Sequence, residues 1–197
     1  MSSGGRGRSI RTEEGVVEVQ RGDLLATHSQ GGWGSRLIRL GAALRDQPNL
    51  ANHIALVHHV DEAGTCWVLE GRPGGVGWRD ATAYLESRYT LCNASQPKTQ
   101  AQRDAVCKGA VALVGTAYDW AAIAADAGGA AGPDLDKVWE LKWPKTGVPG
   151  HVVCSSLADF LYMKAKLDNP PKEREVSPAD WVQLWIDRGW ASRPGKG

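Results

Sequence analysis

The chain has 197 residues, of which 42% are hydrophobic and 23% are charged. This length predicts a single globular domain that buries roughly 70% of the surface its unfolded chain would expose. The 23 basic and 22 acidic residues nearly balance, giving a net charge of +1. The sequence has no basic stripe, which argues against a nucleic-acid partner.

The sequence also lacks the patterns of membrane and secreted proteins. Its longest apolar run, residues 120–132, contains Asp126 and is too short to cross a bilayer. Residues 1–15 contain no apolar stretch of the kind that secretory signals carry. We therefore expect no stable membrane insertion and a cytoplasmic location.

The cysteines are widely spaced along the chain, at Cys66, Cys92, Cys107 and Cys154. They form no CxxC pair and no Cys/His pair at zinc-finger spacing, so we expect neither a metal nor another cofactor. The pattern predicts reduced thiols in a cytosol-like compartment. A disulfide between two of the first three is the open alternative.

The first part of the chain predicts a disordered lead followed by strands. Residues 1–15 are polar and glycine-rich and are expected to be disordered. "VVEVQRGDLLATH" at 16–28 then reads as two short strands, separated by a turn at Arg21-Gly22-Asp23. Apolar residues at helical spacing predict a helix at 35–44.

The middle of the chain predicts a β-hairpin. "NHIALVHHV" at 52–60 and "TCWVLEG" at 65–71 are strand-like runs joined by the turn sequence "DEAG". Residues 72–80 are expected to form a loop with at most a short strand, and residues 88–94 another strand.

The last part of the chain predicts helices at 97–115, 118–127, 154–166 and 179–189, with a long Gly- and Pro-rich loop at 128–150. Gly115 stops the first helix, and Ser177-Pro178 caps the last, which Gly189 ends. An extended link at 169–178 precedes that last helix. Strands followed by helices predict an α+β fold, in one domain at 16–190 with a flexible tail at 191–197.

Cys154 lies in the first turn of the helix predicted at 154–166. Leu157 and Leu161 recur there at helical spacing, so one face is expected to be buried with Cys154 at its edge. The unpaired N–H groups and the positive end of the helix dipole stabilise a thiolate at such a position. The thiolate is the nucleophilic form. The competing interpretation is a thiol that fills the core, since free Cys is among the most buried residue types.

A nucleophilic Cys needs a base, and the base needs an orienting partner. His53 begins the first strand of the predicted hairpin, and Glu70 lies near the end of the second. If the strands pair through "DEAG", the two side chains become neighbours at one rim of the sheet. A carboxylate there would fix the tautomer of the imidazole and stabilise its charged form. The alternative is an unrelated surface His and surface Glu at strand ends.

A family resemblance connects these residues. The pieces that carry it occur in this order: "RGDLLATH", "GSRLIRLG", "NHIALVHH", "VLEGRPGGVG", "GTAYDW", "VVCSSLADFLY" and "VSPADW". Together they span about residues 21–181, and they resemble the circularly permuted NlpC/P60-type cysteine hydrolases. In this papain-like group, the YiiX-like and lecithin:retinol acyltransferase-like branches carry the His before the Cys.

The resemblance implies a small antiparallel sheet packed against helices, with Cys154 as nucleophile, His53 as general base and Glu70 as its orienting carboxylate. It also implies that the backbone N–H of Cys154 is the first donor to the oxyanion. Tyr118 is the candidate for the second donor, with a Tyr at the edge of the core as the alternative. His58 is a reserve candidate, because acyltransferase-like relatives use a second His.

The expected activity is therefore hydrolysis of an amide bond in a peptide, an isopeptide or a peptidoglycan stem peptide. One alternative keeps the three residues but acts on lipid-like acyl groups, as a thioesterase or acyltransferase. Another is a non-enzymatic structural module of a larger assembly, such as a phage particle. If a cell-wall substrate requires export, the absence of a visible signal peptide implies release by lysis, a holin or a secretion machine, as for a phage-encoded protein. The oligomeric state is left open.

Overall fold

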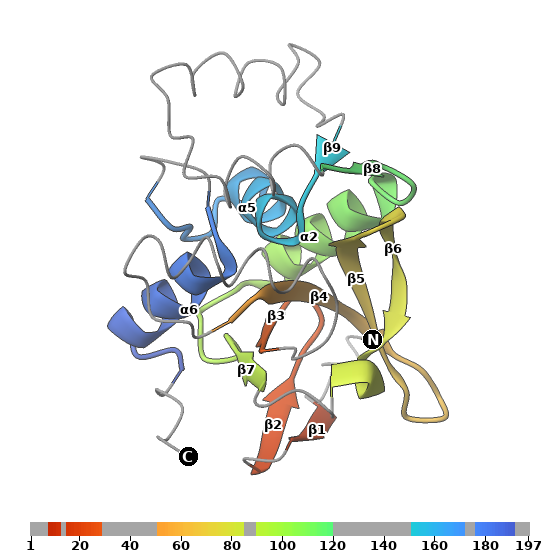
Figure 1. The fold of residues 1–197 in the computed structure, drawn as a ribbon. Coiled ribbons are helices and arrows are strands. Elements are labelled where there is room, and N and C mark those ends of the chain that lie inside the picture. The colour runs from red at the N-terminus through yellow and green to blue at the C-terminus, as the bar shows by residue number, and fades with distance from the viewer. Residues whose placement is uncertain are drawn as a thin grey trace.

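The computed structural model describes residues 8–12, 15–28, 51–84, 90–119, 151–171 and 176–191. The predicted α+β class is confirmed, because the described residues form an antiparallel five-stranded sheet together with helices (Figure 1). The strand order is β6-β5-β4-β3-β7. The strands are β3 (Leu24–Thr27), β4 (His53–Val60), β5 (Cys66–Arg72), β6 (Gly75–Asp80) and β7 (Thr90–Cys92).

The helices follow the predicted boundaries closely. They are α2 (Gln100–Ala112), α5 (Cys154–Lys164) and α6 (Pro178–Asp187), with a short 3₁₀ helix, η1, at Ala81–Tyr84. The side chain of Ser177 accepts a hydrogen bond from the backbone of Asp180, as the predicted cap requires. Gly115 follows α2 with φ of +87°, a conformation that glycine adopts without strain. None of the described helices is both long and apolar enough to span a membrane.

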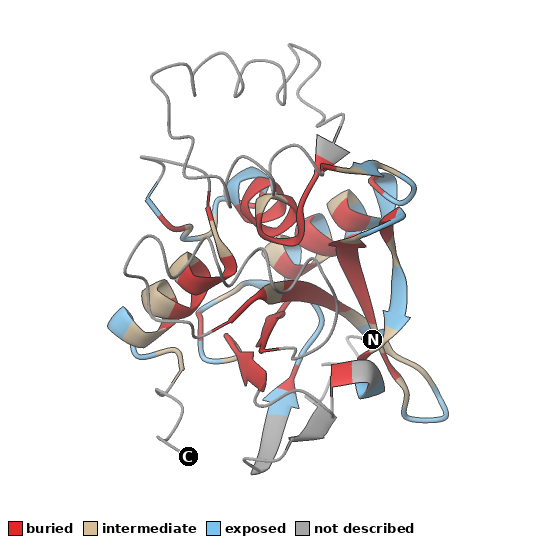
Figure 2. Ribbon diagram, in the orientation of Figure 1, coloured by how far each residue is buried: buried red, intermediate tan, exposed pale blue. Residues whose placement is uncertain are grey.

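Both faces of the sheet are covered by apolar side chains. Ile54, Leu56 and Leu69 belong to the larger core cluster, which they share with α2, α5 and α6. The alternate positions Ala55 and Val57 belong to a second cluster on the other face, with residues from β2 (Gly15–Val19), β5, β7 and η1. Figure 2 shows the buried residues concentrated in the sheet and in the helices, and α5 is buried around most of its circumference.

A buried ion cluster holds the turn between β2 (Gly15–Val19) and β3. The Asp23 carboxylate accepts hydrogen bonds from Lys98 Nζ at 2.9 Å and from Arg103 Nη1 at 2.7 Å. The Tyr162 hydroxyl donates to the carbonyl of Gly22 at 2.8 Å. The predicted turn is therefore tied to the start of α2 and to α5.

The structure corrects two strand predictions. Arg8–Thr12, expected to be disordered, forms β1 and pairs antiparallel with β2, which supplies the backbone partners that an isolated segment lacks. Residues 75–80, expected to be mainly loop, form β6 and pair with β5 along its full length. Gly75 has φ of +106°, which lets the chain turn back at that point.

The helix predicted at 118–127 is wrong at its start. Ala117–Tyr118 forms β8, which pairs in parallel with β9 (His151–Val152), so a tertiary pairing overrides the alanine-rich pattern. The remainder of that helix, the helix predicted at 35–44 and the loop at 128–150 lie outside the described residues.

Candidate active site

Strands β4 and β5 separate at one end of the sheet. Their ladder ends at the pair Leu56–Leu69. Beyond it, within the described residues, the start of β4 pairs with β3 and the end of β5 pairs with β6. In Figure 1, β5 turns away from β4 toward β8. The start of α5 lies against this end of β5, because a Cβ atom at Gly71 would be only 3.3 Å from the backbone nitrogen of Cys154.

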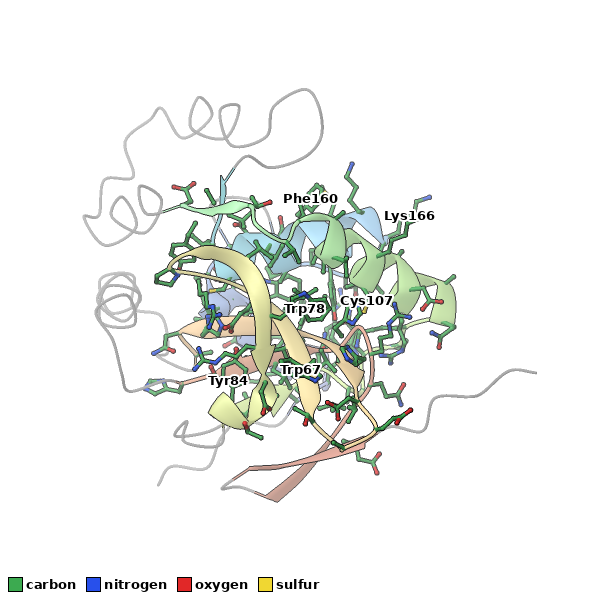
Figure 3. The ribbon with its side chains drawn as sticks, turned by 90° about the vertical axis from the view of Figure 1, so that its right-hand side faces the viewer. Trp67, Trp78, Tyr84, Cys107, Phe160 and Lys166 are labelled. Atoms are coloured by element: carbon green, nitrogen blue, oxygen red, sulfur yellow. The ribbon has the colours of Figure 1, made fainter. Side chains whose placement is uncertain are left out.

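The side chains of His53 and Glu70 meet at this open end. Nε2 of His53 lies 2.6 Å from Oε2 of Glu70, as predicted from the hairpin. The Tyr84 hydroxyl donates to the same carboxylate oxygen, and the Tyr84 ring stacks beside the imidazole with a centroid separation of 5.9 Å. Tyr84 comes from η1 and is labelled in Figure 3. Glu70 is thus held on one oxygen by two donors.

Cys154 completes the cluster. Its side chain lies near enough to the His53 ring to raise the pKa of that ring. Burial lowers the pKa of His53, but Cys154 and Glu70 outweigh burial and raise that pKa to about 10. The ring is therefore protonated at neutral pH, so a positive charge lies beside the Cys154 side chain. Cys154 is 2% exposed, whereas the His53 side chain is 19% exposed, so the cluster contacts solvent through His53.

The charge of Glu70 is stabilised despite its burial. Burial raises the pKa of this carboxyl, but its hydrogen bond and charge interaction with His53 and the hydrogen bond from Tyr84 lower it below the ordinary value. The guanidinium groups of Arg72 and Arg79 also lie within 4 Å of Oε1. Glu70 is therefore ionised at neutral pH, which is the form that supports an imidazolium.

The start of α5 presents Cys154 at a helix N-terminus. The Ser156 hydroxyl accepts a hydrogen bond from the backbone N–H of Val153 at 2.9 Å, and the first helical bond runs from Leu157 to the Val153 carbonyl. Within the described part of the chain, the N–H of Cys154 has no backbone acceptor. This N–H is available as a donor.

Tyr118 lies close to the cluster. It pairs with Val152 two residues before Cys154. Burial, followed by the negative charges of Cys154 and Glu70, raises the pKa of its hydroxyl above the ordinary value. The Tyr118 hydroxyl therefore keeps its proton near the Cys154 side chain. A hydrogen-bond donor to an oxyanion must be protonated in this way.

The structure does not bring the reserve candidate His58 into the cluster. His58 lies five residues along β4 from His53 and contacts His59 and Trp78. Burial and the charges of Arg21 and His59 lower its pKa to about 4. Among the residues that the structure describes, no group of His, Cys, Asp and Glu side chains could hold a metal ion.

The other three cysteines are free, buried thiols without a comparable partner. Burial, the first cause in each case, raises the pKa of Cys66 to about 11, that of Cys107 to about 11, and that of Cys92 further. No disulfide joins them. Cys154 differs from all three in having an imidazole beside its sulfur.

Sequence reasoning missed three residues of the site. Arg72 follows Glu70 at the spacing of one strand face, so alternation along β5 could have indicated it. Arg79 reaches the site only because 75–80 is a strand, and Tyr84 only because η1 folds back under the sheet. Neither has a local sequence signal.

Comparisons of the chain with protein-family models, with curated proteins and with solved structures gave no match.

Proposed function

We propose that the protein is a thiol-dependent hydrolase that cleaves an amide bond through Cys154, His53 and Glu70, on a permuted papain-like fold of the NlpC/P60 type. The single observation that carries the proposal is that the imidazole 2.6 Å from a buried carboxylate also interacts with the side chain of Cys154. An imidazole between a thiol and an orienting carboxylate is the arrangement of a nucleophilic cysteine.

Each group has a chemical role in this mechanism. Because Nε2 of His53 is bound to Glu70, Nδ1 is the ring nitrogen that remains for the sulfur. The Cys154 thiolate attacks the carbonyl carbon, and the resulting oxyanion accepts hydrogen bonds from the N–H of Cys154 and from Tyr118. His53 gives its proton to the departing amine as the C–N bond breaks, which leaves a thioester on Cys154.

Hydrolysis of the thioester follows the same path with water. His53, now neutral, takes a proton from the attacking water, and the C–S bond breaks to release a carboxylic acid and regenerate the thiolate. Glu70 holds the imidazole in one orientation through both halves and balances its positive charge. The substrate class proposed is a peptide, an isopeptide or a peptidoglycan stem peptide.

Intact-mass measurement on a substrate panel tests this function. Peptides, muropeptides and acyl thioesters are offered to the wild-type chain and to Cys154→Ala. The proposal expects amide turnover with a transient acyl adduct on Cys154, and none in the variant. Adducts from thioesters but never from amides would instead identify a thioesterase or acyltransferase. No adduct from any substrate would favour a non-enzymatic module.

A further inference from the structure

Two arginines flank the buried carboxylate of the cluster. Nη1 of Arg72 lies 3.7 Å and Nη1 of Arg79 lies 3.8 Å from Oε1 of Glu70. These are ion-pair distances and are too long for good hydrogen bonds. Accordingly, Oε1 has no hydrogen-bond partner among the described residues. Glu70 therefore orients the two cations without using up their N–H donors.

The arginine donors face solvent. The side chains of Arg72 and Arg79 are 41% and 42% exposed, whereas that of Glu70 is 2% exposed. The guanidinium carbon of Arg79 also lies 6.0 Å from the centre of the Tyr84 ring, and the hydroxyl of that ring is bound to Glu70. Arg79 is thus positioned by the same residues that position His53.

The sheet register leaves space between the two side chains. Arg79 pairs with Val68, Gly77 with Glu70, and Gly75 with Arg72, so both arginines and Glu70 share one face of the sheet. Gly77 lies between the two arginines on that face. A Cβ atom at Gly77 would meet nothing within 4 Å. An open surface therefore adjoins two cationic groups beside the cluster.

We propose that Arg72 and Arg79 bind a carboxylate carried by the leaving group of the substrate, a specificity that rests on the proposed hydrolase. A guanidinium presents parallel N–H donors that match a carboxylate. Glu70, which both arginines flank, binds His53, the residue that protonates the departing amine. The substrate class is an amide whose amine portion bears an α-carboxylate or an acidic side chain.

Binding is tested by NMR of the full chain labelled with ¹⁵N-arginine. The probes are N-acetylglycine, which carries an α-carboxylate, N-acetylaspartic acid α-amide, which carries a side-chain carboxylate, and the neutral N-acetylglycinamide. We expect at least one acid to shift the Nε–H signals of Arg72 and Arg79 saturably, and the neutral amide to leave them unchanged. Which acid binds identifies the source of the carboxylate. The binding should weaken in high salt, because the site is partly exposed.

Matched variants make this test specific. Arg79→Gln should weaken the affinity for the bound acid by about 5-fold or more, because one of two charge-assisted contacts is lost. Arg188→Gln should leave it unchanged, since Arg188 pairs with Asp168 at the end of α6. The proposal is overturned if neither acid shifts the two arginines, or if Arg188 responds as strongly as they do.

Alkylation of Cys154 connects the anion site to the sulfur. In this step the thiolate forms a C–S bond and iodide leaves with the electrons of the C–I bond. Iodoacetate carries a charged carboxylate where iodoacetamide carries a neutral carboxamide, and the two reagents are otherwise the same. In the Arg72→Gln/Arg79→Gln variant, the ratio of the iodoacetate rate to the iodoacetamide rate should fall by about 10-fold, because the cations that attract the carboxylate are gone.

The outcomes separate the two proposals. A rate ratio that the double variant leaves unchanged contradicts the carboxylate site. If Cys154 reacts with neither reagent, the proposed hydrolase activity is contradicted, and so is the proposal that the arginines bind the leaving group. The NMR titration then still decides whether the arginines bind a carboxylate. Fast reaction of Cys154 without carboxylate binding leaves the hydrolase standing and removes the anion specificity.

Discussion

The backbones of Gly71, near the end of β5, and Cys154, at the start of α5, approach each other so closely that any side chain at position 71 would crowd the helix. A Cβ atom at position 71 would lie 3.2 Å from the carbonyl carbon of Val153 and 3.3 Å from the nitrogen of Cys154. Gly71 is not among the glycines with positive φ, so the requirement for glycine is one of space. The missing side chain lets the helix bring its first residue to the imidazole.

Gly71→Ala should therefore move the start of α5 and separate the sulfur from His53. We expect the rate of Cys154 alkylation by iodoacetamide to fall by roughly a few-fold, since the backbone must move by a few tenths of an ångström and a displacement of about 1 Å can cost about 100-fold in a positioned site. Gly109→Ala is the matched control, because its Cβ meets only the flexible end of Leu161. A rate that Gly71→Ala leaves unchanged would show that this contact does not position Cys154.

The ionisation of His53 can be followed by ¹⁵N NMR of its ring. In the wild-type chain the ring should stay protonated through neutral pH and titrate near pH 10. Cys154→Ala and Glu70→Gln should each lower this midpoint, because each removes a group that raises the pKa, while burial still lowers it. Glu62→Gln, in the exposed turn of the hairpin, is the control. A midpoint near 6.5 in the wild-type chain would contradict the cluster.

The same raised pKa predicts how stability depends on pH. A group with a higher pKa in the folded state stabilises that state fully below its unfolded pKa of about 6.5. The contribution is then lost as pH rises through the folded pKa of about 10. The difference in unfolding free energy between the wild-type chain and His53→Gln should therefore shrink across this window. Urea denaturation at several pH values measures it, and a difference that grows with pH would have the wrong sign.

Two tyrosines near the cluster should behave differently. Tyr84→Phe removes a hydrogen-bond donor to Glu70, so the pKa of Glu70 should rise. Because Glu70 is bound to His53, the titration midpoint of His53 should shift from its wild-type value. Tyr118→Phe removes the proposed oxyanion donor, so it should leave the His53 titration unchanged and lower amide turnover by about 10- to 1000-fold. Titration and turnover measured on both variants distinguish the two roles. Turnover that Tyr118→Phe leaves intact would remove Tyr118 from the mechanism.

Asp23 should matter for stability and not for chemistry. Asp23→Asn leaves the cations of Lys98 and Arg103 buried without their counter-charge, which should cost about 3–5 kcal/mol of unfolding free energy. Asp168→Asn breaks only an exposed pair with Arg188 and should cost less than about 1 kcal/mol. Denaturation with urea measures both. If Asp23→Asn lowers the unfolding free energy as little as Asp168→Asn does, the stabilising role of the buried ion cluster is contradicted.

The parts of the fold that the sequence predicted have local causes. The hairpin of β4 and β5 follows from two short apolar runs around a short turn, and that turn places His53 near Glu70 before any tertiary contact is known. The ends of α2 and α6 follow from the capping residues Thr99 and Ser177 and from the glycines beyond the helices. Cys154 stands out because a polar-to-apolar change marks the start of its helix.

The parts that were missed depend on contacts between distant segments. The parallel pair β8–β9 joins residues more than thirty positions apart and overrides an alanine-rich pattern at Tyr118. The ladder between β4 and β5 stops at Leu56–Leu69, beyond a register shift between Val57 and His59. Tyr84 reaches Glu70 only through the path of η1. No periodicity within a short window encodes such relationships.

The most direct test of the account compares two thiols of the same chain. Cys154 and Cys107, which is labelled in Figure 3, are 2% and 0% exposed, so burial alone predicts equally slow alkylation. Iodoacetamide labelling at neutral pH, followed by peptide mass mapping, gives both rates in one sample. Because an adjacent imidazolium favours the thiolate, we expect Cys154 to react at least about 10-fold faster than Cys107, and His53→Ala to abolish the difference. Equal rates in the wild-type chain, or a fast Cys154 that His53→Ala leaves unchanged, would contradict it.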